Sequence, residues 1–144
     1  MKKRWSWWVL VGLFLIGFYN FTASPVSNDA HTLMIFKRLD FLSATDIALL
    51  DRIIRKFAHL LSYGILALLI RNALNPHPWA YPGAWLMATF YGASDEFHQI
   101  YVSGRTPLLT DVMIDSLGAC LALFIIYLMN LKKEKCEDQF QKSK

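Results

Sequence analysis

Ionisable side chains gather in segment 91–118, although the chain is strongly apolar on both sides of it. The segment reads YGASDEFHQIYVSGRTPLLTDVMIDSLG and holds four carboxylates, a histidine, a glutamine and an arginine. Such groups in an apolar setting could bind a charged ligand, move protons or act as general acids and bases. They could equally pair with one another and lock helix ends together. The residue types alone favour neither interpretation.

Helical spacing places most of these groups on shared faces. Lys56, His59 and Tyr63 are spaced i, i+3, i+7, and Asp111 and Asp115 are spaced i, i+4. Residues at these intervals lie on one side of an α-helix. We therefore expect one polar face on each of the two segments.

Two further groups of polar residues precede the last apolar segment. Asp95 and Glu96 lie one turn before Gln99 and point about 100° apart on a helix, so at least one of the two acids is expected to face inward. Arg105 follows in a glycine-containing turn and could reach Asp95, Glu96 or Asp111. The ligand-binding candidates are Lys56, His59, Tyr63, Asp95, Glu96, Gln99, Arg105, Asp111 and Asp115.

Neither a metal nor a cofactor is expected. Cys120 and Cys136 lack metal-ligand spacing, no HExxH-type motif is present, and His59 is interpreted as a hydrogen-bonding residue. No Ser-His or Cys-His arrangement indicates a covalent mechanism. The catalytic residues of an enzyme, if this is one, therefore stay unassigned.

Four apolar runs must position the polar groups, at about residues 5–21, 53–74, 79–101 and 107–131. The hydrophobic fraction is 55%, more than so small a soluble domain could bury. A helical span needs about 20 residues, and backbone groups in lipid must be paired internally. We expect an all-α integral membrane bundle of four transmembrane helices, forming one domain over residues 1–144.

The long connection at 22–52 offers one clear local signal. The sequence SATD at 43–46 matches a helix capping box, and the residues after it could continue into the second span. Residues 33–42 mix bulky apolar and charged side chains. They could lie flat in the membrane interface or pack over the bundle. The first run is longer than a signal-peptide core and lacks a cleavage site, so we expect an uncleaved helix.

Basic residues predict the orientation of the spans. With both termini in the cytoplasm, nine of the 15 lysines and arginines lie on the cytoplasmic side, including the charged tail 132–144. The positive-inside rule therefore favours an N-in, C-in topology. The polar ends of the second, third and fourth spans then meet at the outer surface as one shared site. The lysines and arginines form no stripe, which argues against nucleic-acid binding.

In combination, three polar motifs and a turn resemble the VanZ-like family over about residues 5–130: Lys56-x-x-His59-x-x-x-Tyr63, Asp95-Glu96-x-x-Gln99, Gly104-Arg105 and Asp111-x-x-x-Asp115-x-x-Gly118. One departure is Arg55, where many members have aspartate. The resemblance implies a multi-pass protein of the bacterial plasma membrane and cell envelope. It also implies a link to antibiotic resistance, as lowered susceptibility to teicoplanin, without implying a reaction.

Three functions stay open at this stage. The first is binding of a lipid-linked cell-wall precursor or a glycopeptide antibiotic in an outward-facing polar cavity. The second is a membrane enzyme that modifies an envelope lipid, with Glu96 or Asp115 as general base. The third is a proton- or ion-coupled transporter, for which a homo-oligomer would supply more helices. The lipid bilayer is an expected partner in all three.

Overall fold

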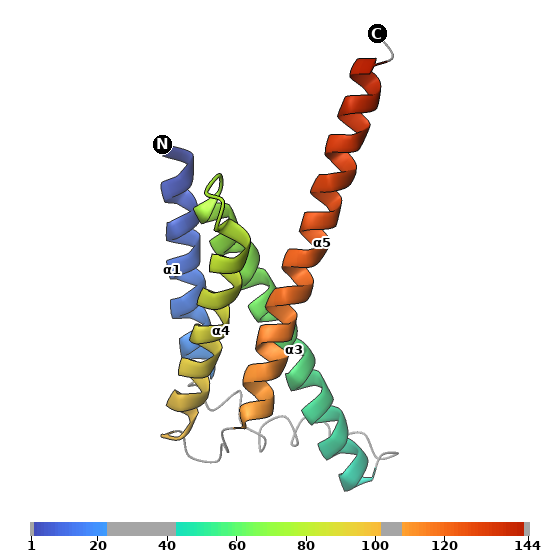
Figure 1. Ribbon diagram of the computed structural model, residues 1–144. Helices are drawn as coiled ribbons and strands as arrows, with labels where there is room; N and C mark the ends of the chain where they lie inside the picture. Colours follow the sequence, from blue (N-terminus) through green and yellow to red (C-terminus); the bar gives the residue numbers. More distant parts are fainter. Residues whose placement is uncertain (1, 23–42, 102–107, 143–144) are drawn as a thin grey trace.

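The computed structural model describes residues 2–22, 43–101 and 108–142, and Figure 1 shows their arrangement. Within these ranges the regular structure consists of four α-helices: α1 (Lys2–Thr22), α3 (Ala44–Leu74), α4 (Ala80–Gln99) and α5 (Leu109–Lys142). The expectation of an all-α chain is confirmed for this part of the protein. Residues 33–42, Thr106 and Pro107 lie outside the described ranges, so the expectations for them stay predictions.

Helix α3 begins well before the apolar run that predicted it. Its N-cap is Ser43, whose hydroxyl accepts a hydrogen bond from the Asp46 amide at 3.2 Å and donates one to the Asp46 carboxylate at 2.6 Å. The capping motif at 43–46 is thus confirmed. Because the helix continues from Ala44 to Leu74 without a break, the residues around Asp51 and Arg55 belong to the same helix as Lys56 and His59.

Helix α5 also exceeds its predicted span. It begins at Leu109 and continues to Lys142, through most of the charged segment that follows the apolar run. Its 34 residues correspond to about 51 Å, whereas the hydrocarbon core of a bilayer is about 30 Å thick. One end of α5 therefore extends well beyond the length that a membrane needs.

Helix α3 lies at the centre of the bundle. It packs against α1, α4 and α5, and α4 also packs against α5. Figure 1 shows α3 and α5 crossing, with the N-terminal part of α3 and the C-terminal part of α5 projecting beyond the other helices. The apolar core between the helices consists of Val11, Tyr63, Leu66, Ala67, Ile70, Ala84, Ala88, Ala119 and Leu123.

Glycines allow α3 and α5 to approach closely where they cross. A Cβ atom at Gly118 would collide with the backbone of Leu60, lying 2.9 Å from its Cα atom. A Cβ atom at Gly64 would lie 3.2 Å from the carbonyl oxygen of Gly118. Small residues are the usual means by which helices pack closely in membranes.

Two helices in the described part of the chain, α3 and α5, are long and apolar enough to cross a membrane. Only 28% and 22% of their most apolar stretches are buried, so most residues of these stretches are at least partly exposed. A core helix of a soluble protein would instead be mostly buried. A lipid environment covers such surfaces, whereas water would leave a large apolar patch exposed.

Candidate functional site

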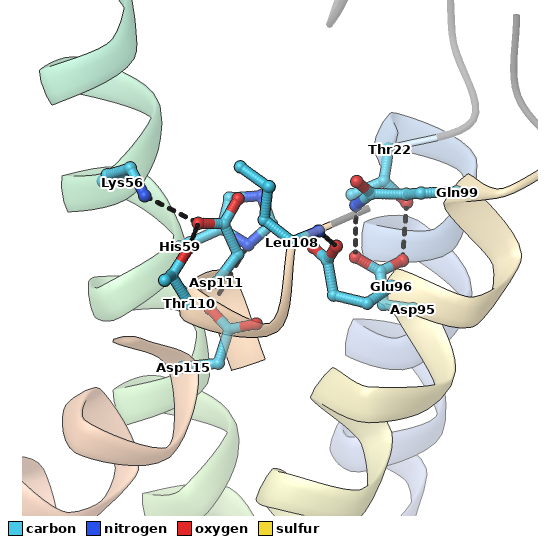
Figure 2. Close-up of polar contacts among 10 residues, drawn as sticks. All are labelled: Thr22, Lys56, His59, Asp95, Glu96, Gln99, Leu108, Thr110, Asp111 and Asp115. Atoms are coloured by element: carbon cyan, nitrogen blue, oxygen red, sulfur yellow. Dashed lines mark hydrogen bonds and ion pairs between the residues drawn. The ribbon is translucent and has the colours of Figure 1, made fainter. Parts of the chain in front are cut away.

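Two polar pairs join α3 to α5 near the start of α5. Lys56 Nζ lies 2.6 Å from Asp111 Oδ1, and His59 Nδ1 lies 3.3 Å from Asp115 Oδ1 (Figure 2). The first pair is partly open, with side-chain exposures of 34% and 27%. Asp115 is completely buried. The Lys56–Asp111 pair lies nearer the start of α5, and we call it the outer pair. The His59–Asp115 pair lies one turn further along α5, and we call it the inner pair.

Asp95 of α4 faces α1. Its Oδ1 atom accepts a hydrogen bond from the Thr22 hydroxyl at 3.1 Å, and its Oδ2 atom accepts one from the Gln99 amide at 3.2 Å. All three side chains are buried. Each carboxylate oxygen thus has a donor, and this contact ties the last residue of α1 to α4 (Figure 2).

Glu96 faces the opposite neighbour, α5. Its Oε2 atom accepts a hydrogen bond from the backbone amide of Leu108 at 2.9 Å, immediately before the first residue of α5. Amides at a helix N-terminus lack partners within the helix, and a carboxylate there also interacts favourably with the helix dipole. Glu96 therefore caps α5 from another helix. Both acids of the Asp95–Glu96 pair face inward, each toward a different helix.

Below the outer pair, Tyr63 and Asp115 form the inner end of the site. Asp115 Oδ2 and the Tyr63 hydroxyl are buried and have no hydrogen-bond partner among the described residues. Gly92 provides the space for both side chains. A Cβ atom there would lie 3.2 Å from Asp115 Oδ2 and 3.3 Å from Tyr63 Cε1. Phe18 of α1 packs edge-on against Tyr63, with ring centroids 5.5 Å apart.

We call the eight described candidate residues the carboxylate cluster: Lys56, His59, Tyr63, Asp95, Glu96, Gln99, Asp111 and Asp115. A cavity of about 50 Å³ opens at this cluster between three helices. Its lining consists of Arg55, Lys56 and His59 from α3, Gln99 from α4, and Asp111 and Ile114 from α5.

Arg105 lies outside the described residues, so its expected contacts with the acids stay a prediction. Three contributors were not identified from the sequence as part of the site: Thr22, the Leu108 amide and Gly92. The position of Thr22 directly after the first apolar run was the available signal, because Asp95 lies near the corresponding end of the third run. Gly92 was recognisable only as part of a small-residue patch.

Among the described residues, no three histidine, cysteine, aspartate or glutamate side chains are grouped so that they could hold a metal ion. His59 instead hydrogen-bonds Asp115, and His98 packs against Tyr19 with ring centroids 4.7 Å apart.

The fold and the site together define a class: a helical membrane protein with a buried, carboxylate-rich polar cluster at one end of its bundle. The VanZ/LLP1 family model matches residues 5–130. The chain belongs to the VanZ/LLP1 family, which confirms the resemblance noted from its polar motifs. No curated protein and no solved structure matches the sequence.

Proposed function

We propose that this VanZ-family protein binds an anionic group of a lipid-linked cell-wall precursor at the carboxylate cluster. In this proposal it crosses the bacterial plasma membrane four times, with both termini in the cytoplasm. The cluster then opens at the outer surface of the membrane, in the cell envelope. Sequestering such a precursor would also alter susceptibility to antibiotics of the teicoplanin type.

The cavity between α3, α4 and α5 is the observation that carries this proposal. Its volume of about 50 Å³ is far below the roughly 300–1,000 Å³ of pockets that enclose drug-sized ligands. It can hold a few water molecules or one small group, such as a phosphate. A lipid-linked precursor fits this limit, because its phosphate can enter while its lipid chain stays in the bilayer. A glycopeptide antibiotic is too large to enter as a whole.

The lining of the cavity holds two cations and one carboxylate, Asp111, so it can bind an anion only through a cation that keeps a donor to spare. Arg55 and Lys56 both line it, and each also contacts a carboxylate of the protein, Asp51 at 2.9 Å and Asp111 at 2.6 Å. A lysine ammonium has three N–H donors, and only one is needed for the bond to Asp111. Lys56 can therefore hold Asp111 and a ligand oxygen at the same time. The Gln99 amide is a further polar group in the lining.

The geometry supports the enzyme alternative less well. Glu96, one candidate base, already accepts a hydrogen bond from the Leu108 amide. Asp115, the other, is fully buried and is separated from the cavity lining by its position one turn deeper. A general base must lie within hydrogen-bond reach of the proton that it removes. In this conformation neither carboxylate is open to a substrate.

A transport path through the described helices also has little support. Beyond Tyr63, the core of the bundle is apolar for several turns, with Leu66, Ala67 and Ile70 on α3 and Ala84 and Ala88 on α4. Ion and proton pathways in membranes are lined by polar or ionisable groups. The carboxylate cluster is thus better suited to holding a group than to conducting one.

Native mass spectrometry of the gently extracted full-length protein tests this function. We expect an adduct whose mass corresponds to a lipid-linked cell-wall precursor, and we expect Lys56→Met to lose most of it. Lys133→Met is the matched control, because Lys133 also pairs with a carboxylate, Glu137 at 3.8 Å, but lies far along α5. An unchanged adduct in Lys56→Met, or a wild-type protein without any such adduct, would contradict the proposal.

A further inference from the structure

A second polar cluster lies at the end of the bundle opposite the carboxylate cluster. It consists of Arg71 near the end of α3, Tyr81 near the start of α4 and Asn130 on α5, and we call it the arginine cluster. Arg71 Nη2 donates to the Tyr81 hydroxyl at 3.0 Å, and Asn130 Nδ2 donates to the same oxygen at 3.0 Å. Three helices therefore converge on one hydroxyl group.

The position of the guanidinium group of Arg71 is fixed from several sides. Its Cζ atom lies 4.8 Å from the centroid of the Tyr81 ring, a cation–π contact. Its Nη1 atom donates to Asn72 Oδ1 at 3.0 Å. Tyr127 of α5 packs edge-on against the Tyr81 ring, and the two ring centroids are 5.8 Å apart. The cation is thus preorganised before any ligand arrives.

The arginine cluster has more hydrogen-bond donors than acceptors. The Tyr81 oxygen already accepts two hydrogen bonds, so both of its lone pairs are used and its own proton can be donated. Arg71 Nε is buried and has no partner among the described residues. No carboxylate in the described chain forms an ion pair with Arg71, whereas Arg55, Lys56 and Lys133 each have one.

The natural ligand of a partly buried cation such as Arg71, with more donors than acceptors around it, is an anionic oxygen. Guanidinium groups bind phosphates in a planar, two-point geometry, and basic pockets between transmembrane helices bind the headgroups of anionic lipids. Trp79, two residues before Tyr81, is 67% exposed, as is typical of a side chain that marks the membrane interface. The arginine cluster therefore lies at headgroup depth if the helices span a membrane.

We propose that the arginine cluster is a binding site for phosphate oxygens, with Arg71 as the cation and the Tyr81 hydroxyl as a further donor. The phosphate is supplied by an anionic phospholipid of the leaflet at this end of the bundle, which is the cytoplasmic leaflet in the topology proposed above. This site is separate from the carboxylate cluster and does not depend on what that cluster binds.

Native mass spectrometry of the full-length protein, released from nanodiscs, tests this site. Phosphatidylglycerol, phosphatidylcholine and inorganic phosphate are supplied in separate arms. We expect the wild-type protein to retain phosphatidylglycerol and to retain phosphatidylcholine much less. Arg71→Gln should lower phosphatidylglycerol retention about tenfold, as expected when a two-point phosphate contact is lost. Arg71→Lys keeps the charge but not the planar geometry and should give an intermediate loss.

Arg52→Gln is the matched control, because Arg52 is an exposed arginine on the same helix at the other end of the bundle. It should retain phosphatidylglycerol like the wild type. Far-UV circular dichroism verifies that each variant keeps its helix content. Wild-type retention of phosphatidylglycerol in Arg71→Gln overturns the proposal. Retention of inorganic phosphate alone would support phosphate binding and overturn the lipid as its source.

Discussion

At the scale of single residues, each of the four carboxylates of the candidate site contacts a partner from another part of the chain, and three of the four are buried. Asp111 and Asp115 contact side chains of α3, Asp95 contacts the end of α1, and Glu96 contacts the backbone at the start of α5. Removing one partner of a buried pair leaves the other charge without compensation, and this usually costs more stability than replacing both partners. The predicted cost therefore depends on how buried each partner is.

The contact of Thr22 with Asp95 is expected to stabilise the fold measurably. Thr22→Val keeps the side-chain shape but removes the hydroxyl that donates to a buried carboxylate. We expect a loss of about 1–2 kcal/mol of unfolding free energy, measured by denaturation of the purified protein in detergent. Thr89→Val is the control, because its hydroxyl donates to the neutral Ser116 hydroxyl at 3.0 Å. An equal effect of both variants would contradict a special role for the carboxylate.

The Lys56–Asp111 pair is expected to couple weakly. Both side chains are about one third exposed, so solvent screens their attraction. A double-mutant cycle of Lys56→Met and Asp111→Asn should give a coupling energy of about 0.5–1 kcal/mol. A coupling of several kcal/mol would show that the pair is a structural lock, and would argue against a lysine that is available to a ligand.

The residue pattern predicted which groups meet, but not all their partners. Spacing on two helices was sufficient to place Lys56 and His59 on one face and Asp111 and Asp115 on another, and the structure brings these two faces together. Thr22 and the Leu108 amide could not be predicted in the same way. Their contacts depend on the depth at which α1 ends and α5 begins, and helical spacing carries no information about that depth.

At the scale of helices, the crossing of α3 and α5 determines whether the outer and inner pairs align. Small residues at the crossing bring the two backbones into contact. The sequence predicted the helices from their apolar runs, yet α3 and α5 both extend well beyond those runs. Capping and helix propensity continue a helix where apolar content ends, so hydropathy alone sets its boundaries too narrowly.

Gly118→Ala should destabilise the bundle at this crossing. The added methyl group would meet the backbone of Leu60, which cannot move aside as a flexible side chain could. We expect a loss of about 1–3 kcal/mol or more, as in other overpacked cores, seen as a lower thermal midpoint by circular dichroism. Gly12→Ala is the control, because nothing lies within 4 Å of its added Cβ atom. A Gly118→Ala protein as stable as Gly12→Ala would disprove the close crossing.

At the scale of the whole molecule, the topology decides what the carboxylate cluster can meet. Two helices satisfy the length and apolarity that a membrane requires. Helix α4 is shorter, and it carries Asp95 and Glu96 in its last turns. The four-span, N-in and C-in arrangement therefore rests on the apolar runs and on the positions of the basic residues.

The native Cys136 provides a direct test of this orientation. It is exposed on α5 beyond the apolar run, and we expect it to lie in the cytoplasm. In a Cys120→Ala background, a membrane-impermeant maleimide should label Cys136 only after the cells are permeabilised. A cysteine at the exposed Ala48 position, in a chain that lacks both native cysteines, should be labelled in intact cells. The reverse pattern would place the carboxylate cluster on the cytoplasmic side.

The central claim is that the cavity beside Lys56 holds an anionic group of a lipid-linked precursor. The most direct measurement is the Kd of this precursor for the protein in nanodiscs, compared between the wild type, Lys56→Met and Lys133→Met. Loss of one charge-assisted contact, worth about 1.5–3 kcal/mol, should weaken binding roughly ten- to 100-fold in Lys56→Met, while Lys133→Met binds like the wild type. Equal Kd values for all three proteins would contradict the account.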